Sequence, residues 1–167
     1  AVVRTHTALV GLDRDGPRWR SRFRDGLTGE EGEAISRCVV NAAGPWAAQF
    51  LAEHAHAARG KSLRLVKGSH VIVPKLFDHP YAYIFQNPDK RIIFAIPYEG
   101  DFTLLGTTDV PFDGDPARVE ISPQERDYLL ACLARFFREP VTEADIRGTF
   151  AGVRPLFDDG SGSGASS

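Results

Sequence analysis

The segment "LRLVKGSHVIVP", residues 63–74, decides which fold the sequence favours. Its two apolar ends alternate in the manner of β-strands, but Lys67, Gly68, Ser69 and His70 separate them. A surface turn between two short strands would explain these four residues. An active-site strand would also explain them, because a glycine within a strand lets a bulky group approach the backbone. Both interpretations predict β-structure here, and only the second predicts a function.

The composition is that of a folded protein without a strong charge. The sequence has 167 residues, of which 43% are hydrophobic and 25% charged, and its formal net charge is −2. These values allow a sizeable core and indicate no basic surface for nucleic acid. No apolar run is long enough to span a bilayer, and Cys38 and Cys132 fit no metal-ligand spacing. We therefore expect neither a nucleic-acid partner nor a metal site.

Residues 1–60 predict a β-meander followed by one helix. Alternating runs typical of strands cover residues 1–13, 18–25 and 34–42. Pro45 suits the first position of a helix, because its φ is fixed and its missing N–H has no partner there. We therefore expect a helix over residues 46–59, with Gly60 as its C-cap.

Residues 61–157 predict a mostly antiparallel β-sheet with helices on one face. Strand-like runs cover residues 63–66, 69–74, 81–86, 91–98, 102–106 and 147–157. Their short connections favour sequential antiparallel pairing. Ser122 to Glu125 resembles a capped helix start, and apolar residues at helical spacing continue to Glu139. The fold class is therefore α+β, and the Gly/Ser-rich tail, residues 158–167, should be flexible.

Four short segments could carry chemistry, each at the end of an apolar run. They are "VVNAAGPW" at 39–46, "KGSH" at 67–70, "GTTD" at 106–109 and "GVRP" at 152–155. The first precedes a helix N-terminus, which could hold an anion. His70 could act as a general base and Arg154 could hold an anionic oxygen. Taken singly, each is more often a packed residue or an ordinary turn.

Five motifs in a fixed order resolve these alternatives. They are "NAAGPW" at 41–46, "RLVKGSHVIVP" at 64–74, "YIFQNPDKRIIFAIPY" at 83–98, "LLGTTDV" at 104–110 and "GVRPLFDD" at 152–159. Together they closely resemble the FAD-dependent glycerol-3-phosphate dehydrogenases, which belong to the D-amino-acid-oxidase-like flavoproteins. The resemblance covers nearly the whole chain.

The resemblance implies a reaction and a role for particular residues. Members of the family oxidise sn-glycerol 3-phosphate to dihydroxyacetone phosphate on FAD and pass the electrons to a quinone. His70 would be the catalytic base. The substrate ligands would be Lys67, Thr107 and Arg154, and the residues beside FAD would be Asn41, Ala42, Ala43 and Gly44. The protein would act in the cytoplasm, as a peripheral protein on the cytoplasmic face of the inner membrane.

The same resemblance assigns the parts of the chain. Residues 1–60 would belong to a partial FAD domain, residues 61–157 would form the substrate-binding (cap) domain, and residues 158–167 would be the tail. The sequence contains no GxGxxG motif and lacks the family's C-terminal arginine and lysine. We therefore expect a fragment of a longer enzyme that by itself neither binds FAD tightly nor turns over. Two alternatives are a stand-alone binding module without redox activity and a sister FAD oxidase of another substrate.

Overall fold

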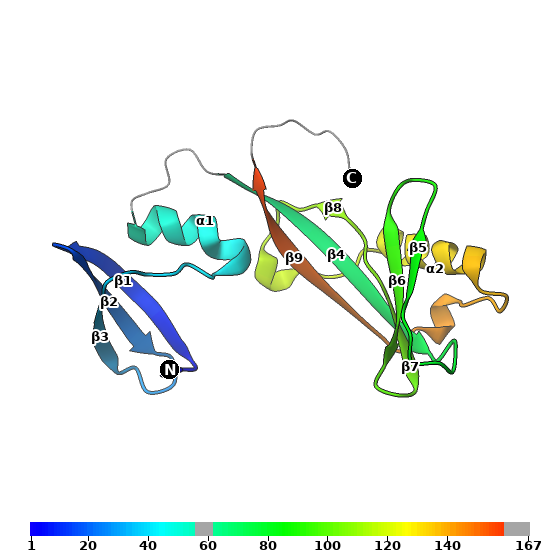
Figure 1. Ribbon diagram of the computed structural model, residues 1–167, viewed down its shortest axis with the longest axis horizontal. Coiled ribbons are helices and arrows are strands. Elements are labelled where there is room, and N and C mark those ends of the chain that lie inside the picture. Colours follow the sequence, from blue (N-terminus) through cyan, green and yellow to red (C-terminus); the bar gives the residue numbers. More distant parts are fainter. Residues whose placement is uncertain (56–61, 159–167) are drawn as a thin grey trace. The chain divides into compact units, whose positions relative to one another are not determined.

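The computed structural model describes residues 1–55 and 62–158. The chain divides into two compact units, Ala1–Ser62 and Leu63–Ser167. The first contains a β-meander and short helical segments, and the second contains a larger, mostly antiparallel sheet with a helix (Figure 1). The predicted α+β class is confirmed. No helix in the described ranges is long and apolar enough to cross a bilayer.

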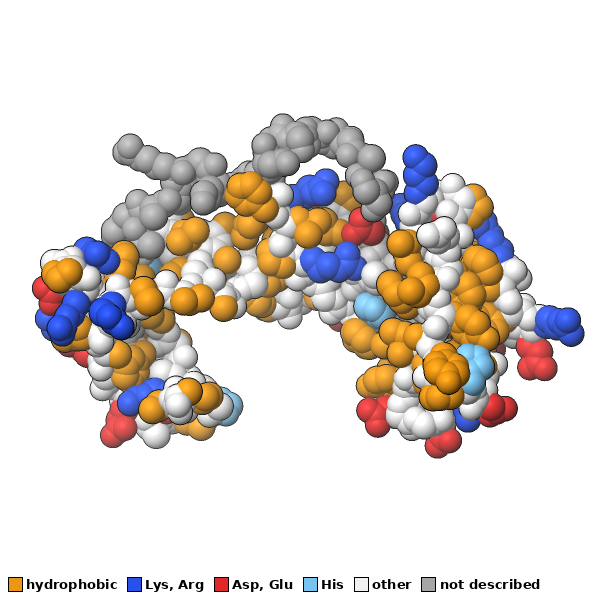
Figure 2. All heavy atoms as spheres, in the orientation of Figure 1, with side chains coloured by type: hydrophobic (Ala, Val, Ile, Leu, Met, Phe, Trp, Pro, Cys, Tyr) orange, Lys and Arg blue, Asp and Glu red, His pale blue; other side chains and the backbone are white. Residues whose placement is uncertain are grey.

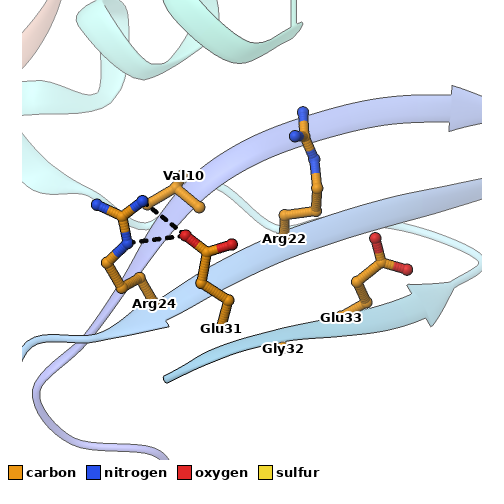
Figure 3. Close-up of a pocket in the computed structure, with 6 residues that line it drawn as sticks. All are labelled: Val10, Arg22, Arg24, Glu31, Gly32 and Glu33. Atoms are coloured by element: carbon orange, nitrogen blue, oxygen red, sulfur yellow. Dashed lines mark hydrogen bonds and ion pairs between the residues drawn. The ribbon is translucent and has the colours of Figure 1, made fainter. Parts of the chain in front are cut away.

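The meander of the first unit pairs β1 (Thr7–Asp15), β2 (Arg18–Asp25) and β3 (Glu31–Ser36) in that order. The turn between β1 and β2 has two residues, of which Gly16 adopts a φ of +56° that suits glycine. Arginines alternate along β2 on one face and pair with acidic residues of the neighbouring strands. Figure 3 shows one such pair, Arg24 with Glu31. The pairs are exposed and contribute little to stability.

The segment after β3 differs from its prediction. Residues 37–43 form no strand, because no strand among the described residues pairs with them, and Val40 is 83% exposed. A 3₁₀ turn (Gly44–Trp46), α1 (Ala47–Phe50) and a π-helical turn (Leu51–Ala55) replace the single helix expected here. Pro45 does lie in the first turn, as predicted. The remainder of the predicted helix and Gly60 lie outside the described residues.

The second unit is built around β4 (Ser62–Pro74), which is one continuous strand. The interpretation of "KGSH" as a turn is therefore wrong. The sheet has the order β5 (Tyr83–Gln86), β6 (Ile92–Tyr98), β7 (Phe102–Gly106), β4 and β8 (Val110–Pro111), and β9 (Gly148–Asp158) also pairs with β4. The sequential antiparallel pairing predicted for β5, β6 and β7 is confirmed. It is wrong for β4, which pairs with β7 and not with β5, the next strand in the chain. Figure 1 shows β4 and β9 side by side.

One face of this sheet packs against α2 (Pro123–Phe136), and we call it the back face. The core residues between them are Val71, Val73, Ile93, Ala95, Leu105, Leu129, Cys132 and Leu133. The predicted helix start is confirmed, because Ser122 and Glu125 form a capping box. The helix ends at Phe136, three residues before the predicted end. Short 3₁₀ turns at Pro116–Arg118 and Glu143–Asp145 flank it in the chain.

The opposite face of the same sheet, which we call the front face, is apolar and partly exposed. One row of neighbouring residues across it runs Ile84, Phe94, Gly106 and His70. Ile84 is 63% exposed. Hydrophobic side chains gather over β5, β6 and β7 in the space-filling view (Figure 2). His70 therefore lies in line with the apolar residues Ile84 and Phe94.

Candidate functional site

Successive side chains of β4 point to opposite faces of the sheet, which separates the members of the "KGSH" segment. Lys67 and Ser69 point to the back face, where both contact Glu125 of α2. Gly68 and His70 point to the front face. The candidate site is therefore the group of side chains around Gly68 and His70.

Gly68 has no side chain, and the side chains of Arg154 and Thr107 occupy the space that its Cβ would fill. A Cβ atom added at Gly68 would collide with Arg154 Nη2 and would lie 2.5 Å from Thr107 Oγ1. Arg154 belongs to β9, and Thr107 follows the last residue of β7, so three segments meet at this point. The bulky group that approaches the glycine is therefore a guanidinium of the same chain.

A β-bulge beside β4 turns Thr107 toward the front face. The flanking residue pairs are Lys67 with Val110 and His70 with Gly106. Two residues of β4, 68 and 69, therefore face three residues, 107–109, of the neighbouring segment. In such a bulge the usual alternation of side chains is interrupted. Thr107 contacts Arg154 on the front face, whereas Thr108 contacts Glu125 on the back face.

Arg154 is held by oxygen atoms of this bulge. Its Nη2 donates to Thr107 Oγ1 at 2.8 Å and to the Thr108 carbonyl at 3.2 Å, and its Nη1 donates to Asp109 Oδ1 at 3.1 Å. The side chain is still 42% exposed. These contacts leave some of the guanidinium N–H donors available for another oxygen ligand.

His70 is a half-buried imidazole beside this guanidinium. Its ring stacks on Phe150 of β9 with the ring centroids 4.7 Å apart, and a Cβ at Gly106 would lie 2.7 Å from its Cγ. Burial lowers the pKa of His70 below its ordinary value, and the charge of Arg154 lowers it further. Its Nδ1 is buried and has no hydrogen-bond partner among the described residues. The ring is therefore unprotonated at neutral pH and able to accept a proton.

Lys67 is not brought together with the other predicted substrate ligands. Its Nζ lies 2.7 Å from Glu125 Oε2 and donates to the Glu120 carbonyl at 3.0 Å. The side chain is only 12% exposed. The reason is the alternation along β4, which directs residue 67 to α2 and residues 68 and 70 to the front face.

The predicted cofactor segment, residues 41–44, lies in the first unit. Asn41 Oδ1 accepts a hydrogen bond from the Ala43 N–H at 3.1 Å, and its Nδ2 donates to the Ala47 carbonyl at 2.9 Å. Ala42 is exposed. Gly44 has a φ of +54°, and a Cβ added there would meet nothing within 4 Å. The Asn41 side chain thus holds the turn that leads into α1.

Three features of the site were not predicted. Phe150 stacks on His70, Asp109 pairs with Arg154, and Glu125 joins the back face to α2. The segment "GTTD" was predicted to be either a turn or a polar part of the site, and the bulge found there was not predicted. No local signal identifies Phe150, because its contact depends on β9 pairing with β4, a strand far away in the sequence.

Comparisons with known proteins agree on one family. The chain matches the family described as FAD dependent oxidoreductase over residues 1–165. It is 45% identical over 162 residues to a glycerol-3-phosphate dehydrogenase of Pseudomonas aeruginosa, covering 95% of this chain and 31% of that protein. It is 43% identical over 162 residues to the D-erythritol 1-phosphate dehydrogenase of Brucella abortus, covering 97% of this chain and 32% of that protein.

A solved structure agrees with the fold. The glycerol-3-phosphate dehydrogenase from Bacillus halodurans, complexed with FAD, is similar with a TM-score of 0.78 at 34% identity, covering 92% of this chain and 32% of that chain. The chain thus spans about a third of the length of each of these relatives. The family predicted from the five motifs is confirmed. The chain belongs to the FAD-dependent oxidoreductase family.

Proposed function

We propose that the chain is part of an FAD-dependent dehydrogenase that oxidises sn-glycerol 3-phosphate to dihydroxyacetone phosphate. The observation that carries the proposal is that His70, Thr107 and Arg154 lie together on the front face of the sheet. The His70 imidazole is unprotonated there, and the neighbouring Arg154 guanidinium retains N–H donors for a ligand. The similarity to a glycerol-3-phosphate dehydrogenase at 45% identity supports the substrate. In this proposal residues 1–60 belong to the FAD domain and residues 61–157 bind substrate.

The proposed roles follow from the chemistry of alcohol oxidation. The hydroxyl proton must be removed while a hydride leaves the same carbon atom, so the reaction needs a base and a fixed substrate position. His70 would accept the proton from the C2 hydroxyl. Arg154 would bind the phosphate or another substrate oxygen through its remaining N–H donors. Thr107, which already contacts Arg154, would contribute a further polar contact.

The residues around His70 fit a flat aromatic cofactor. Phe150 stacks on the ring and Phe94 lies in the same row, so the surface is apolar. A bound flavin supplies the group that accepts the hydride. Residues 41–44 are proposed to run past FAD. Because the sequence contains no GxGxxG loop, we expect the 167 residues alone neither to hold FAD tightly nor to turn over.

The proposal includes the electron acceptor and the location that the family resemblance implies. The acceptor would be a quinone, and the protein would contact the cytoplasmic face of the inner membrane peripherally. Reduction of a short-chain quinone by the purified whole protein, and its retention on vesicles of bacterial lipids, test these two statements separately. A protein that reduces only a soluble dye and stays in the supernatant would contradict both.

D-erythritol 1-phosphate is a second candidate substrate. The relative named for that activity is 43% identical over 97% of this chain, close to the value for the glycerol-3-phosphate dehydrogenase. Both molecules would present a phosphate to Arg154 and a hydroxyl to His70. They differ in the length of the carbon chain, so the ratio of their kcat/KM values decides between them.

The test is to express the full-length gene and purify the protein. We expect a yellow protein that reduces a redox dye when glycerol 3-phosphate is added. A colourless protein would favour the alternative of a binding module without redox activity. A yellow protein that oxidises neither phosphorylated polyol would favour a sister oxidase of another substrate.

A further inference from the structure

A buried carboxylate behind the front face connects α2 with the bulge that holds Arg154. Glu125 is only 5% exposed. Its Oε1 accepts hydrogen bonds from Ser69 Oγ at 2.9 Å and from Thr108 Oγ1 at 2.6 Å. Its Oε2 lies 2.7 Å from Lys67 Nζ and accepts from the N–H and hydroxyl of Ser122. The carboxylate is therefore fully hydrogen-bonded.

Thr108 links this carboxylate to the candidate site. Its side chain is on the back face, where the hydroxyl donates to Glu125 and accepts from the Ser69 N–H at 2.9 Å. Its carbonyl accepts from Arg154 Nη2 on the front face. Thr108 is buried, with 1% of its surface exposed. One residue thus touches the back-face carboxylate and the front-face guanidinium.

We propose that Glu125, acting through Thr108, is a positioning residue that sets the place of Arg154 in the substrate site. The inference rests on the proposed function, in which Arg154 binds a substrate oxygen. At a bulge the regular ladder of backbone hydrogen bonds is interrupted. The Thr108 N–H still donates to the Ser69 carbonyl at 3.4 Å, and the shorter side-chain bonds of Thr108 to Glu125 and Ser69 hold the bulge in addition. Hydrogen bonds to a carboxylate are stronger than those between neutral groups, which suits Glu125 to this task.

The same arrangement explains why Lys67 and Glu125 are buried as a pair. The ammonium group compensates the carboxylate charge, so the back face adds little net charge to the site in front of it. Outer contacts of this kind orient the groups that bind a ligand without touching the ligand themselves.

Thr108→Val is the informative variant, because valine keeps the shape of threonine and removes its hydroxyl. Glu125 then loses one donor, and the Ser69 N–H loses its acceptor. In the whole, FAD-loaded protein we expect KM for glycerol 3-phosphate to rise about tenfold or more, since small misplacements of a binding group have large effects. We expect kcat to fall less, because His70 is held by the β4–β7 ladder. Thr108→Ser, which keeps the hydroxyl, should restore most of the wild-type KM.

Ser122→Ala is the matched control for loss of stability. It removes the cap of α2 and one donor to Glu125, but leaves the contacts of Glu125 with Ser69, Thr108 and Lys67. This variant should be less stable and retain the wild-type KM. An equal rise of KM in Ser122→Ala and Thr108→Val, or a wild-type KM in Thr108→Val, would overturn the proposal.

Amide hydrogen exchange gives a second readout that does not depend on turnover. Thr108→Val should exchange faster than Ser122→Ala over residues 104–110, because the bulge has lost its contact with Glu125. Equal exchange there in both variants would overturn the positioning role. A wild-type protein that oxidises no phosphorylated polyol would instead refute the proposed function, and the exchange comparison would still decide whether Glu125 positions the bulge.

Discussion

Replacing Glu125 by glutamine measures how much the Lys67–Glu125 ion pair on the back face contributes to the free energy of unfolding. Burial by itself would raise the pKa of Glu125, but hydrogen bonds from Lys67, Thr108 and Ser122 outweigh it and lower the pKa from 4.5 to about 2. One pKa unit corresponds to about 1.4 kcal/mol, so the ionised carboxylate contributes about 3 kcal/mol to the free energy of unfolding at pH 7.

The sign of the pH dependence follows from the lower pKa of the folded state. The contribution of Glu125 is fully present above the unfolded pKa of 4.5 and is lost as the pH falls toward 2. At pH 3 roughly 1 kcal/mol of this contribution remains. Glu125→Gln lacks this contribution and leaves Lys67 without its counter-ion, so it should lower the unfolding free energy at pH 7 by about 3–5 kcal/mol.

Urea unfolding of the 167-residue chain at pH 7 and pH 3 tests this reasoning. All four tyrosines lie in the second unit and both tryptophans in the first, so tyrosine absorbance reports on the unit that contains Glu125. Between pH 7 and pH 3 the wild type should lose about 2 kcal/mol more than Glu125→Gln. Glu139→Gln, at an exposed carboxylate, is the control and should follow the wild type. Equal losses in the wild type and Glu125→Gln would refute the argument.

Three further predictions concern the whole, FAD-loaded protein. His70→Ala should lower kcat by about 10²–10⁴-fold with little change in KM, because a base acts in the chemical step. In the wild type, kcat/KM should decline only below pH 6.5, since burial lowers the pKa of His70; a pH profile unaltered by the mutation would exclude this role. Arg154→Ala should raise KM for glycerol 3-phosphate at least about tenfold through loss of charged hydrogen bonds, and an unchanged KM in steady-state kinetics would contradict it. Gly68→Ala should raise KM in the same way, because its Cβ collides with Arg154 and crowds Thr107; a wild-type KM would show that the guanidinium does not need this space.

Strand pairing and helix starts were predicted correctly where the residues that determine them are close together in the sequence. The runs that became β5, β6 and β7 are joined by short turns, so their pairing follows from the chain itself. The start of α2 was predictable because the capping box lies within four residues, 122–125. A glycine between two apolar runs correctly indicated close approach of a bulky group to β4.

Prediction failed where the outcome depends on distant partners. Residues 37–42 are apolar enough for a strand, but Val40 remains exposed without a pairing strand among the described residues. The resemblance placed Lys67 with the substrate ligands, whereas its neighbour Glu125 is brought to it by α2. The bulge at 107–109 depends on register between β4 and the β7–β8 segment, which motif order alone does not specify.

The alternation along β4 has a consequence for how the sequence of this strand can vary. A replacement at residue 70 changes the front face while leaving the back face, which packs against α2, intact. A one-residue slip in the register of β4 would instead exchange the two faces, bringing the Lys67 ammonium group to the front face and the His70 imidazole against α2. Divergence within this strand should therefore proceed by replacement at constant length.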